Sequence, residues 1–480
     1  MKKVLLLTLL CCGMSIGVSA RTQETLSADG VKIVVVSDPH VMAPELLVSE
    51  GTAWTEYQNG QRKLVDYSKQ LFDVMIARIK NELQPNLVLI TGDLTKDGEQ
   101  LSHQYVIGKL DELRGAGIGT LVIPGNHDRG SNGNAVYYDG GNTTPAEVAT
   151  NEWFAEKYAN YGYTAGANLQ RDPNSLTYAC RPIAGLVVIG IDSGTDGVIS
   201  AATMNWVVAK ASAARANGNR VIAMMHHPLI PHFVGVESFV STAVVSNYEA
   251  VRNALADAGV SVVFTGHFHT SDIAKDWNDD MSREIIDVNT GSLISYPCDY
   301  RVLTLSNGLP EMTITTGHIS ELTSGDGFAA TAKNRLKTAA QNAIAAKGAA
   351  YNFIASTAAD AYIIHTEGNE PENPNTATTL AGLEAAASVA TFIMGQEKVK
   401  ALKDMAYSML QDKSLYGTER ENVTNDLTLN ITFEDDVTGI STVGEPLNRI
   451  PVDCYNLQGV RITRPSKGLC ISNGRKVIVK

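Results

Sequence analysis

The chain has 480 residues, and 44% of them are hydrophobic, so it is long enough for more than one domain and for a core of ordinary density. This composition excludes a wholly disordered chain and a small disulfide scaffold. Acidic residues outnumber basic ones by 51 to 39, and the net charge of −12 repels nucleic-acid backbones and acidic membrane surfaces. We therefore expect no nucleic-acid polymer as a partner, whereas a small anionic substrate held by local cations is compatible with this charge.

The first 20 residues have the pattern of a secretory signal peptide. Two lysines are followed by an apolar run over residues 4–18 and by small residues that end at Ala20. This run is too short for a comfortable membrane span, so we predict cleavage after Ala20 and export to the periplasm, the outer surface or the medium. Cys11 and Cys12 open the alternative of a lipoprotein signal, but neither follows the small residue that a lipobox requires. No transmembrane segment is predicted in the mature chain.

Four cysteines remain after the predicted cleavage: Cys180, Cys298, Cys454 and Cys470. An oxidising compartment allows disulfides between them. Their pairing stays open, and Cys454 with Cys470 is only the pair nearest in sequence.

From residue 31 to about 319, short β-branched runs alternate with helical patterns, which is typical of an α/β domain with buried, largely apolar strands. We assign residues 21–320 to this domain. The predicted strands are residues 33–36, 87–91, 120–123, 186–191, 221–225 and 260–265. The predicted helices are residues 61–83, 100–115, 144–158, 203–217 and 247–258. Thr144 and Pro145 are expected to open the third helix, as a cap followed by a first-turn proline.

Residues 321–433 differ in composition and predict a helical segment packed on this domain. Alanine dominates residues 328–361, a polar hinge with Pro371 and Pro374 follows, and a second helical stretch covers residues 378–410. His365 is expected to be a surface or packing residue.

Residues 434–480 predict a small basic β module. From residue 437 onward it holds seven Lys or Arg against two Asp or Glu, with β-forming runs around Cys454 and Cys470. It resembles the short C-terminal sorting or anchoring modules of secreted bacterial proteins, which would make export or cell-surface machinery a partner. A basic hairpin without this role is the alternative.

Residues that commonly bind metals follow the predicted strands again and again. They are Asp38 and His40, Asp93, then Asn126, His127 and Asp128, then His226 and His227, and finally His267 and His269. Each short pattern alone is weak, but their conjunction after apolar runs is informative, because α/β sheets present ligands at the carboxyl ends of their strands.

This mixture of carboxylates and imidazoles, with no cysteine in any motif, suits two ions of Mn, Fe or Zn and argues against a structural zinc site. Two neighbouring cations repel each other, so a shared carboxylate is expected between them, and Asp93 is the natural bridge. A bound water would then lose its proton at neutral pH and attack a phosphorus atom as hydroxide. The chain has no GxSxG elbow, Walker loop or dinucleotide fingerprint that would support another chemistry.

The ordered set Asp-x-His, Gly-Asp, Gly-Asn-His-Asp, His and Gly-His-x-His closely resembles the signature of the calcineurin-like metallophosphoesterases, over residues 31 to 319. The resemblance implies a β-sandwich flanked by helices, with the site at the strand ends. It also implies the ligands of two metals. One metal would be held by Asp38, His40, Asp93 and His269. The other would be held by Asp93, Asn126, His226 and His267.

The same resemblance implies roles around the metals. His127 would face the substrate and stabilise or protonate the leaving oxygen, with Asp128 orienting its ring. The family places a ligand two residues before a proline, which favours His226 over His227, and His227 would then lie on the substrate side. His103, His232 and His318 have no motif around them and are expected to be loop, packing or surface residues.

Departures from known subfamilies narrow the function. The Asp-Arg-Gly of serine/threonine protein phosphatases is absent after Asp93, and Lys96 stands where purple acid phosphatases place a metal-binding tyrosine. The run from Gly92 to Gly98 looks more like that of enzymes that hydrolyse small phosphodiesters, including cyclic nucleotides and glycerophosphodiesters. A phosphomonoesterase or nucleotidase of the same superfamily is one alternative, and a non-catalytic surface binding protein on this fold is another.

Substrate charge also favours a diester. A dianionic monoester usually requires extra arginines beside the metals, and Arg129 is the only arginine next to a motif. A loop over residues 130–142 carries Tyr137 and Tyr138, which we expect to approach the site and stack on a base or sugar.

Overall fold

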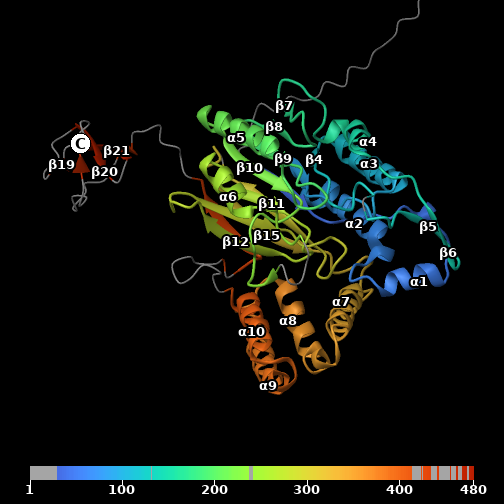
Figure 1. The fold of residues 1–480 in the computed structure, drawn as a ribbon. Helices are drawn as coiled ribbons and strands as arrows, with labels where there is room; N and C mark the ends of the chain where they lie inside the picture. The colour runs from blue at the N-terminus through green and yellow to red at the C-terminus, as the bar shows by residue number, and fades with distance from the viewer. Residues whose placement is uncertain are drawn as a thin grey trace, which may run out of the picture.

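The structure is a computed structural model that describes residues 30–130, 132–236, 242–306, 308–412, 423 and 425–433, together with short strands between residues 441 and 479 (Figure 1). The predicted signal peptide, with Cys11 and Cys12, lies outside the described residues.

Two sheets form the centre of the molecule. The first has the order β16-β15-β14-β1-β3-β4. Its parallel strands are β1 (Val31–Val36), β3 (Leu87–Ile90) and β4 (Gly119–Val122), and its antiparallel strands are β14 (Asp299–Leu305), β15 (Glu311–His318) and β16 (Thr428–Thr432).

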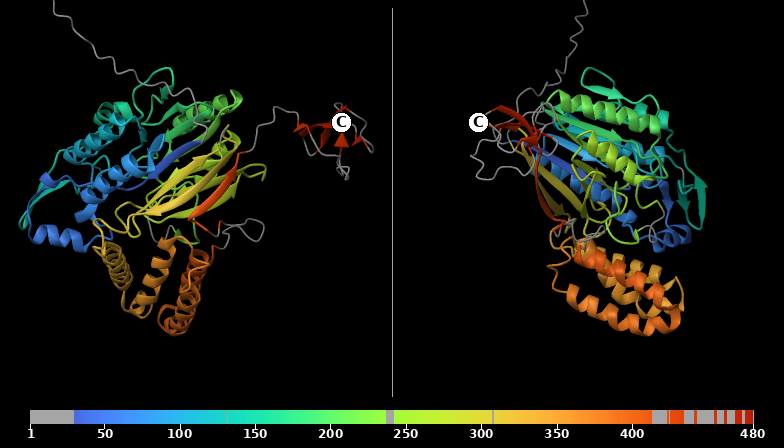
Figure 2. Two further views of the ribbon diagram at one scale, coloured as in Figure 1. Left: turned by 180° about the vertical axis from the view of Figure 1, so that it is seen from behind. Right: turned by 60° about the vertical axis from the view of Figure 1, so that its left-hand side comes forward.

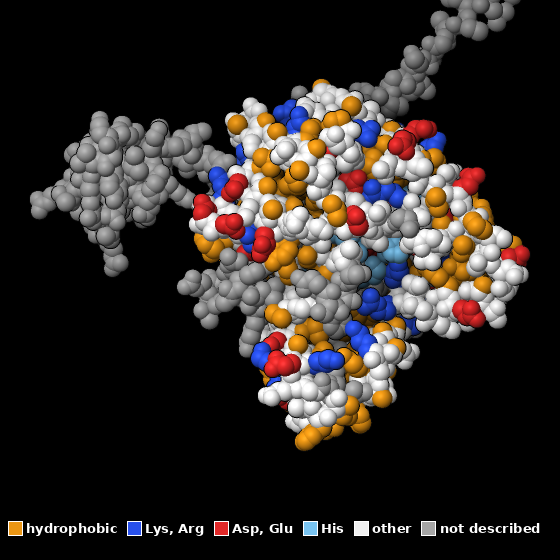
Figure 3. Space-filling model, in the orientation of Figure 1, with side chains coloured by type: hydrophobic (Ala, Val, Ile, Leu, Met, Phe, Trp, Pro, Cys, Tyr) orange, Lys and Arg blue, Asp and Glu red, His pale blue; other side chains and the backbone are white. Residues whose placement is uncertain are grey.

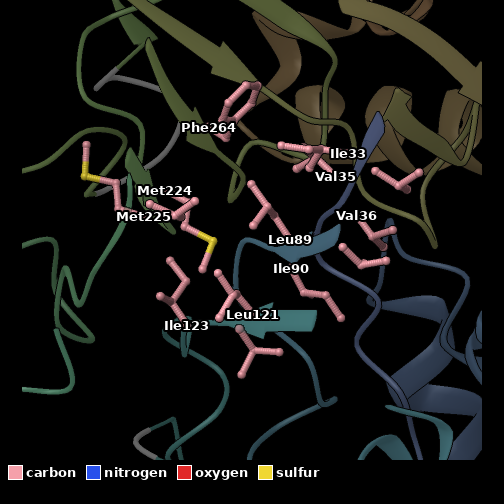
Figure 4. Packing of buried hydrophobic residues seen from close by; sticks show 14 of the residues in the cluster. Ile33, Val35, Val36, Leu89, Ile90, Leu121, Ile123, Met224, Met225 and Phe264 are labelled. Atoms are coloured by element: carbon pink, nitrogen blue, oxygen red, sulfur yellow. The ribbon is translucent and has the colours of Figure 1, made fainter. Parts of the chain in front are cut away.

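The second sheet has seven strands, in the order β12-β13-β11-β10-β9-β8-β7. These are β12 (Asp272–Trp277), β13 (Glu284–Asn289), β11 (Val262–Thr265), β10 (Arg220–Met225), β9 (Leu186–Ile191), β8 (Tyr178–Ile183) and β7 (Leu169–Arg171). Strands β9, β10, β11 and β13 are parallel. The main core lies between the sheets, where Leu89 of the first sheet and Met224 and Phe264 of the second are fully buried (Figure 4).

Helices cover the outer faces of the sandwich. Helix α3 (Gln100–Gly115) packs on β4 and against α2 (Ser68–Arg78), whereas α5 (Ala201–Ala216) and α6 (Tyr248–Asp257) pack on the second sheet. At one side, α1 (Thr52–Asn59) contacts a small sheet of β2 (Leu47–Ser49), β5 (Val136–Asp139) and β6 (Asn142–Pro145), and α4 (Asn151–Lys157) follows it. Short 3₁₀ turns span Pro44–Leu46, Val65–Tyr67, Ala159–Tyr161 and Ala349–Phe353, and Ile79–Leu83 is a π turn.

The six predicted strands are confirmed. Their prediction succeeded because buried parallel strands consist of continuous apolar runs. The helix predicted over residues 144–158 is wrong at its start. Thr144 and Pro145 lie in β6, and the helix begins at Asn151, where the side chain of Thr150 accepts a hydrogen bond from Trp153 N. The helix predicted over residues 61–83 is shorter as an α-helix and begins at Ser68.

Residues after β15 form four stacked helices at one end of the sandwich (Figure 2). They are α7 (Phe328–Ala345), α8 (Ala355–Glu367), α9 (Thr376–Met394) and α10 (Gln396–Gln411). The chain then returns as β16, which pairs with β15. The prediction that residues 321–433 form a helical segment is therefore wrong for the end of this segment. Within α9, Thr376–Ile393 is long and apolar enough to cross a membrane, by length and composition only, with a mean hydropathy of 1.2 and 28% of the window buried.

The described C-terminal strands form a separate five-stranded sheet, in agreement with the predicted β module. In sheet order they are β17 (Ser441–Thr442), β21 (Arg475–Val479), β20 (Gly468–Ser472), β18 (Cys454–Tyr455) and β19 (Arg461–Ile462). The side chains of Cys454 and Cys470 are outside the described part, while Cys180 and Cys298 are buried free thiols.

Candidate metal centre

The predicted ligands come together at the carboxyl edges of the parallel strands, where the two sheets meet. The first sheet supplies four of them from the loops after β1, β3 and β4, and the second sheet supplies three from the loops after β10 and β11. These are Asp38, His40, Asp93 and Asn126, and then His226, His267 and His269. Figure 3 shows histidine side chains in a hollow on this face, with Lys and Arg side chains beside them.

The first ligand group consists of Asp38, His40, Asp93 and His269, and its donor atoms all lie within 4.8 Å of one another. His269 Nε2 is 3.2 Å from His40 Nε2 and 3.3 Å from Asp38 Oδ1. His40 Nε2 is 3.5 Å from Asp93 Oδ2. Donors bound to one ion at about 2.0–2.2 Å are separated by about 3–3.5 Å, so these spacings fit a metal.

The second ligand group consists of Asp93, Asn126, His226 and His267. Asn126 Oδ1 lies 2.9 Å from His226 Nε2 and 3.0 Å from His267 Nδ1. His226 Nε2 is 3.3 Å from Asp93 Oδ2. The same oxygen of Asp93 therefore faces both groups.

Hydrogen bonds around the ligands orient them toward the centre. Asp38 Oδ2 accepts from the hydroxyl of Ser37 and from His267 N at 3.1 Å. His267 N also lies 3.3 Å from Oδ1, the oxygen that faces the first group. His226 Nδ1 lies 3.0 Å from the carbonyl oxygen of Thr91, to which its N–H donates, so Nε2 keeps its lone pair for a metal.

Five ligand residues have positive φ angles, a backbone conformation that residues other than glycine rarely adopt. Their φ angles are 48° at Asp38, 38° at His40, 48° at Asp93, 72° at His267 and 63° at His269. Such strained residues collect at functional sites, where the surrounding structure holds them in place. The tertiary structure therefore forces these loops into the shape that aims their side chains inward.

The motif glycines leave space for the ligands. A Cβ atom on Gly125 would lie 2.2 Å from Asp93 Oδ1, and one on Gly266 would lie 2.0 Å from Ser37 Oγ and 2.5 Å from Asp38 Oδ2. No side chain fits at these distances, so the two positions require glycine because of close packing against the carboxylates.

Gly266→Ala is expected to lower metal content and turnover by about 10–100-fold, since it displaces the groups that orient Asp38. Gly108→Ala is the matched control, because a Cβ there meets nothing within 4 Å in the interior of α3. It should leave activity unchanged and stabilise the helix by up to about 1 kcal/mol. Metal analysis and thermal unfolding of both variants provide the check, and normal metal content in Gly266→Ala would contradict the packing argument.

The charge states of the free ligands also suit metals. Burial lowers the pKa of His40, His267 and His269, so these imidazoles are neutral and offer lone pairs. Burial opposes the charge of Asp93 as well, but the neighbouring histidines, His226 foremost, hold its pKa well below the usual range. Burial disfavours a charged His226, yet Asp93 outweighs it and raises its pKa to about 9, so a metal there would displace a proton.

His127 lies beside the first ligand group, with its ring 4.8 Å from that of His40. Its Nδ1 is 2.8 Å from Asp97 Oδ1 and 2.9 Å from the carbonyl oxygen of Lys96, so the Nδ1 proton is held there and Nε2 stays available. The carboxylate that orients the ring is thus Asp97.

The prediction that Asp128 orients His127 is wrong. The buried carboxylate of Asp128 accepts hydrogen bonds from the backbone N–H groups of Leu94, Thr95 and Gly125, at 2.8–3.1 Å. It therefore ties the loop after β3 to the loop after β4 and holds the backbone of both motifs.

Two further residues at the site were not predicted from the sequence. Asp97 lies four residues after Asp93 in the same motif, and its acidic side chain close to a predicted ligand was the feature that could have indicated it. Lys63 Nζ lies 3.4 Å from His40 Nδ1, and no motif marks it. Burial lowers the pKa of Lys63, against the pull of nearby carboxylates.

Lys96 does not reach the metal groups. Its buried ammonium donates to Asp97, to Glu99 and to the carbonyl oxygen of Asn134, at 2.6, 3.1 and 2.8 Å. The residue that replaces the purple acid phosphatase tyrosine thus supports Asp97 instead.

The predicted substrate-side residues differ in availability. His227 is buried, with Nδ1 2.8 Å from Ser193 Oγ and its ring 4.5 Å from that of His267. Arg129 is paired with Asp192 through both terminal nitrogens, at 2.8 and 3.3 Å. The contacts of both residues with a substrate stay predictions.

The expectation that Tyr138 stacks on a substrate is wrong. Residues 136–139 and 142–145 form the hairpin of β5 and β6, and Tyr138 is only 3% exposed. Its ring packs on those of Trp54 and Tyr57. Much of the expected loop is therefore a β-hairpin, in which Tyr138 is packed away from solvent.

Comparison with known proteins agrees with this arrangement. The family model described as calcineurin-like phosphoesterase matches residues 31–271, half of the chain. A probable glycerophosphodiester phosphodiesterase, GpdQ of Arcobacter nitrofigilis, is 25% identical over 214 residues, which cover 43% of this chain and 64% of that protein. The uncharacterized metallophosphoesterase YkuE of Bacillus subtilis is 39% identical over 57 residues, 12% of this chain and 20% of that protein.

Among solved structures, a dimetal phosphatase from Danio rerio aligns with a TM-score of 0.43 and 12% identity, over 60% of this chain and 97% of that one. The chain spans less than two thirds of the length of the two curated relatives.

Proposed function

Because the chain belongs to the calcineurin-like phosphoesterase family, we propose that it is an exported enzyme that hydrolyses a small phosphodiester with the help of two metal ions. The observation that carries this proposal is the position of Asp93 Oδ2, within 3.5 Å of donors from both ligand groups. A carboxylate oxygen in this position can be shared by two cations, which supports a two-metal site.

The donor sets indicate which ions would bind. The first ligand group would hold one metal and the second the other, with Mn, Fe or Zn as candidates because imidazole and carboxylate suit all three. When bound, two such ions supply a water that is deprotonated at neutral pH and positive charge for the phosphoryl oxygens.

The protein itself would manage the leaving group. With its Nδ1–H held by Asp97 and Lys96, His127 has Nε2 left for a substrate, and 23% of its side chain is exposed. When the ring carries a proton on both nitrogens, it can donate the Nε2 proton to the leaving oxygen, and it becomes the neutral Nδ1–H form. Asp97 holds the ring in this tautomer, and Lys96 holds Asp97.

The cations near the site favour a diester over a monoester. A dianionic monoester requires additional donors, but Arg129 is paired with Asp192 and Lys96 is surrounded by three acceptors. Lys63 Nζ lies 3.4 Å from His40 Nδ1, so its contact is with a ligand of the first group. The similarity to a protein named a probable glycerophosphodiester phosphodiesterase supports the same choice.

Bis-nitrophenyl phosphate should therefore give a kcat/KM about tenfold or more above that of nitrophenyl phosphate. This ratio corresponds to roughly one charged hydrogen bond that the dianionic monoester lacks. Arg129→Ala should change both substrates alike, because its guanidinium is already paired. A monoester preference that collapses in Arg129→Ala would overturn the diester assignment. Turnover of neither substrate by protein containing two metals would instead favour a binding protein on this fold.

The proposal of export is based on the signal-peptide pattern of the residues before Arg21. The proposal that residues 434–480 contact export or cell-surface machinery is based on their resemblance to sorting modules. N-terminal sequencing of the mature protein should give Arg21 as the first residue. A mature chain that retains Met1 would contradict export through this segment.

A further inference from the structure

Three carboxylates from separate parts of the chain meet where the helical segment joins the sandwich, and we call them the carboxylate junction. Glu370 follows α8, Asp412 caps the end of α10, and Asp426 precedes β16. One oxygen from each lies within 4.8 Å of the others. Figures 1 and 2 show that α8 and α10 each have one end at the sandwich. These are their carboxyl ends, which Glu370 and Asp412 follow.

The junction contains carboxylate oxygens without hydrogen-bond partners among the described residues. Glu370 and Asp426 are fully buried. Glu370 Oε1 lies 2.6 Å from His365 Nδ1, and Asp426 Oδ1 accepts from Ile273 N at 2.7 Å. The remaining oxygens, Glu370 Oε2 and Asp426 Oδ2, are unpaired, as is Asp412 Oδ2. Buried oxygens of this kind are costly unless a ligand satisfies them.

The basic side chains around the junction have partners outside it. His365 Nδ1 lies 2.6 Å from Glu370 Oε1, but its Nε2 lies 3.6 Å from Asp272 Oδ2, a carboxylate outside the junction. His232 lies between two carboxylates outside the junction, with Nδ1 3.1 Å from Asp272 and Nε2 3.3 Å from Asp287, and it is ion-paired with both. Arg301 is buried but donates to the carbonyl oxygens of Asn289 and Asp426 and to a threonine hydroxyl.

The two helices add further negative potential. The carboxyl ends of α8 and α10 both carry the negative end of a helix dipole toward the junction, and the last turn of α10 has no basic residue. Burial raises the pKa of Asp412 to about 7, and it raises those of Glu370 and Asp426 well above the usual range, as expected for carboxylates that lack a counter-ion.

We propose that Glu370, Asp412 and Asp426 bind a hard divalent cation, Ca²⁺, at a site separate from the catalytic metals. Oxygen-only donors select Ca²⁺ or Mg²⁺ over the ions that imidazoles prefer. Ca²⁺ is favoured because Mg²⁺ usually keeps several waters, whereas two of the three carboxylates here are completely buried. The ion would join the ends of α8 and α10 to the strand that returns the chain to the sheet.

Equilibrium dialysis of the full-length protein with ⁴⁵Ca²⁺ tests this site. Wild-type protein and Asp93→Asn should each bind one Ca²⁺, since Asp93 belongs to the catalytic centre. Glu370→Gln and Asp412→Asn should bind it at least about tenfold more weakly, because each loses a charged ligand. Absence of Ca²⁺ binding by the wild type, equal binding by both junction variants, or saturation by Mg²⁺ with no Ca²⁺ preference would overturn the proposal.

Thermal unfolding gives a second readout that does not depend on activity. Without Ca²⁺, Asp412→Asn should unfold at the same temperature as the wild type or higher, because the substitution removes repulsion among carboxylates. With the same excess of Ca²⁺, the wild type should gain about 2–4 °C and the variant should gain less. A variant that is less stable than the wild type by the same amount with and without Ca²⁺ would show a purely structural role and contradict the site.

Discussion

Asp93→Asn is expected to lower turnover by about 10³-fold or more and to reduce the content of both metals. Its Oδ2 lies 3.5 Å from His40 Nε2 and 3.3 Å from His226 Nε2, and Oδ1 accepts from His127 N at 2.8 Å. An amide keeps the shape but loses the negative charge that offsets repulsion between two cations. A loss of several kcal/mol of electrostatic stabilisation corresponds to this fall in rate.

Variants that touch one ligand group provide the control. His269→Ala should lose metal mainly from the first group, and His267→Ala mainly from the second, so each should retain about one metal per chain. Metal analysis by plasma mass spectrometry distinguishes these patterns. If Asp93→Asn keeps two metals and near-normal activity, Asp93 is not the bridge and the two-metal function loses its main support.

His127→Ala is expected to keep its metals but to lose about 10²–10⁴-fold in turnover of substrates with alkoxide leaving groups. Nitrophenolate leaves without a proton, so nitrophenyl esters should lose much less. The geometry supports this difference, because Nδ1 is held by Asp97 and the carbonyl oxygen of Lys96, which leaves Nε2 for the substrate. Steady-state kinetics with both leaving-group classes measures it.

Asp97 and Asp128 form a matched pair for the same experiment, since both are buried carboxylates near the centre. Asp97→Asn should reproduce part of the leaving-group dependence, because the carboxylate that holds the Nδ1 proton is lost. Asp128→Asn should instead lower the unfolding temperature, because its oxygens accept from the backbone of Leu94, Thr95 and Gly125. Equal losses for both leaving groups in His127→Ala would remove the proton-donor role.

Local sequence patterns were enough to predict six strands of the two central sheets and the residues that follow them. Buried parallel strands are apolar along their whole length, and their carboxyl ends share an edge, so a local pattern is enough to place Asp38 and Asp93 together. His267 follows a strand of the second sheet and joins them because the two sheets pack on each other. The same locality explains where prediction succeeded for α3 and where it failed for Thr144, whose pairing with Tyr137 in a hairpin overrode a helix-start pattern.

Which side chains meet depends on the three-dimensional paths of distant segments. Asp97 and not its nearer neighbour Asp128 contacts His127, because the loop after β3 folds back over the loop after β4. The pairing of Arg129 with a carboxylate 63 residues away, the approach of Lys63 to His40, and the convergence of the carboxylate junction all depend on the paths of distant segments. Periodicity and propensity describe one segment at a time, whereas contacts between side chains require the position of both partners in space.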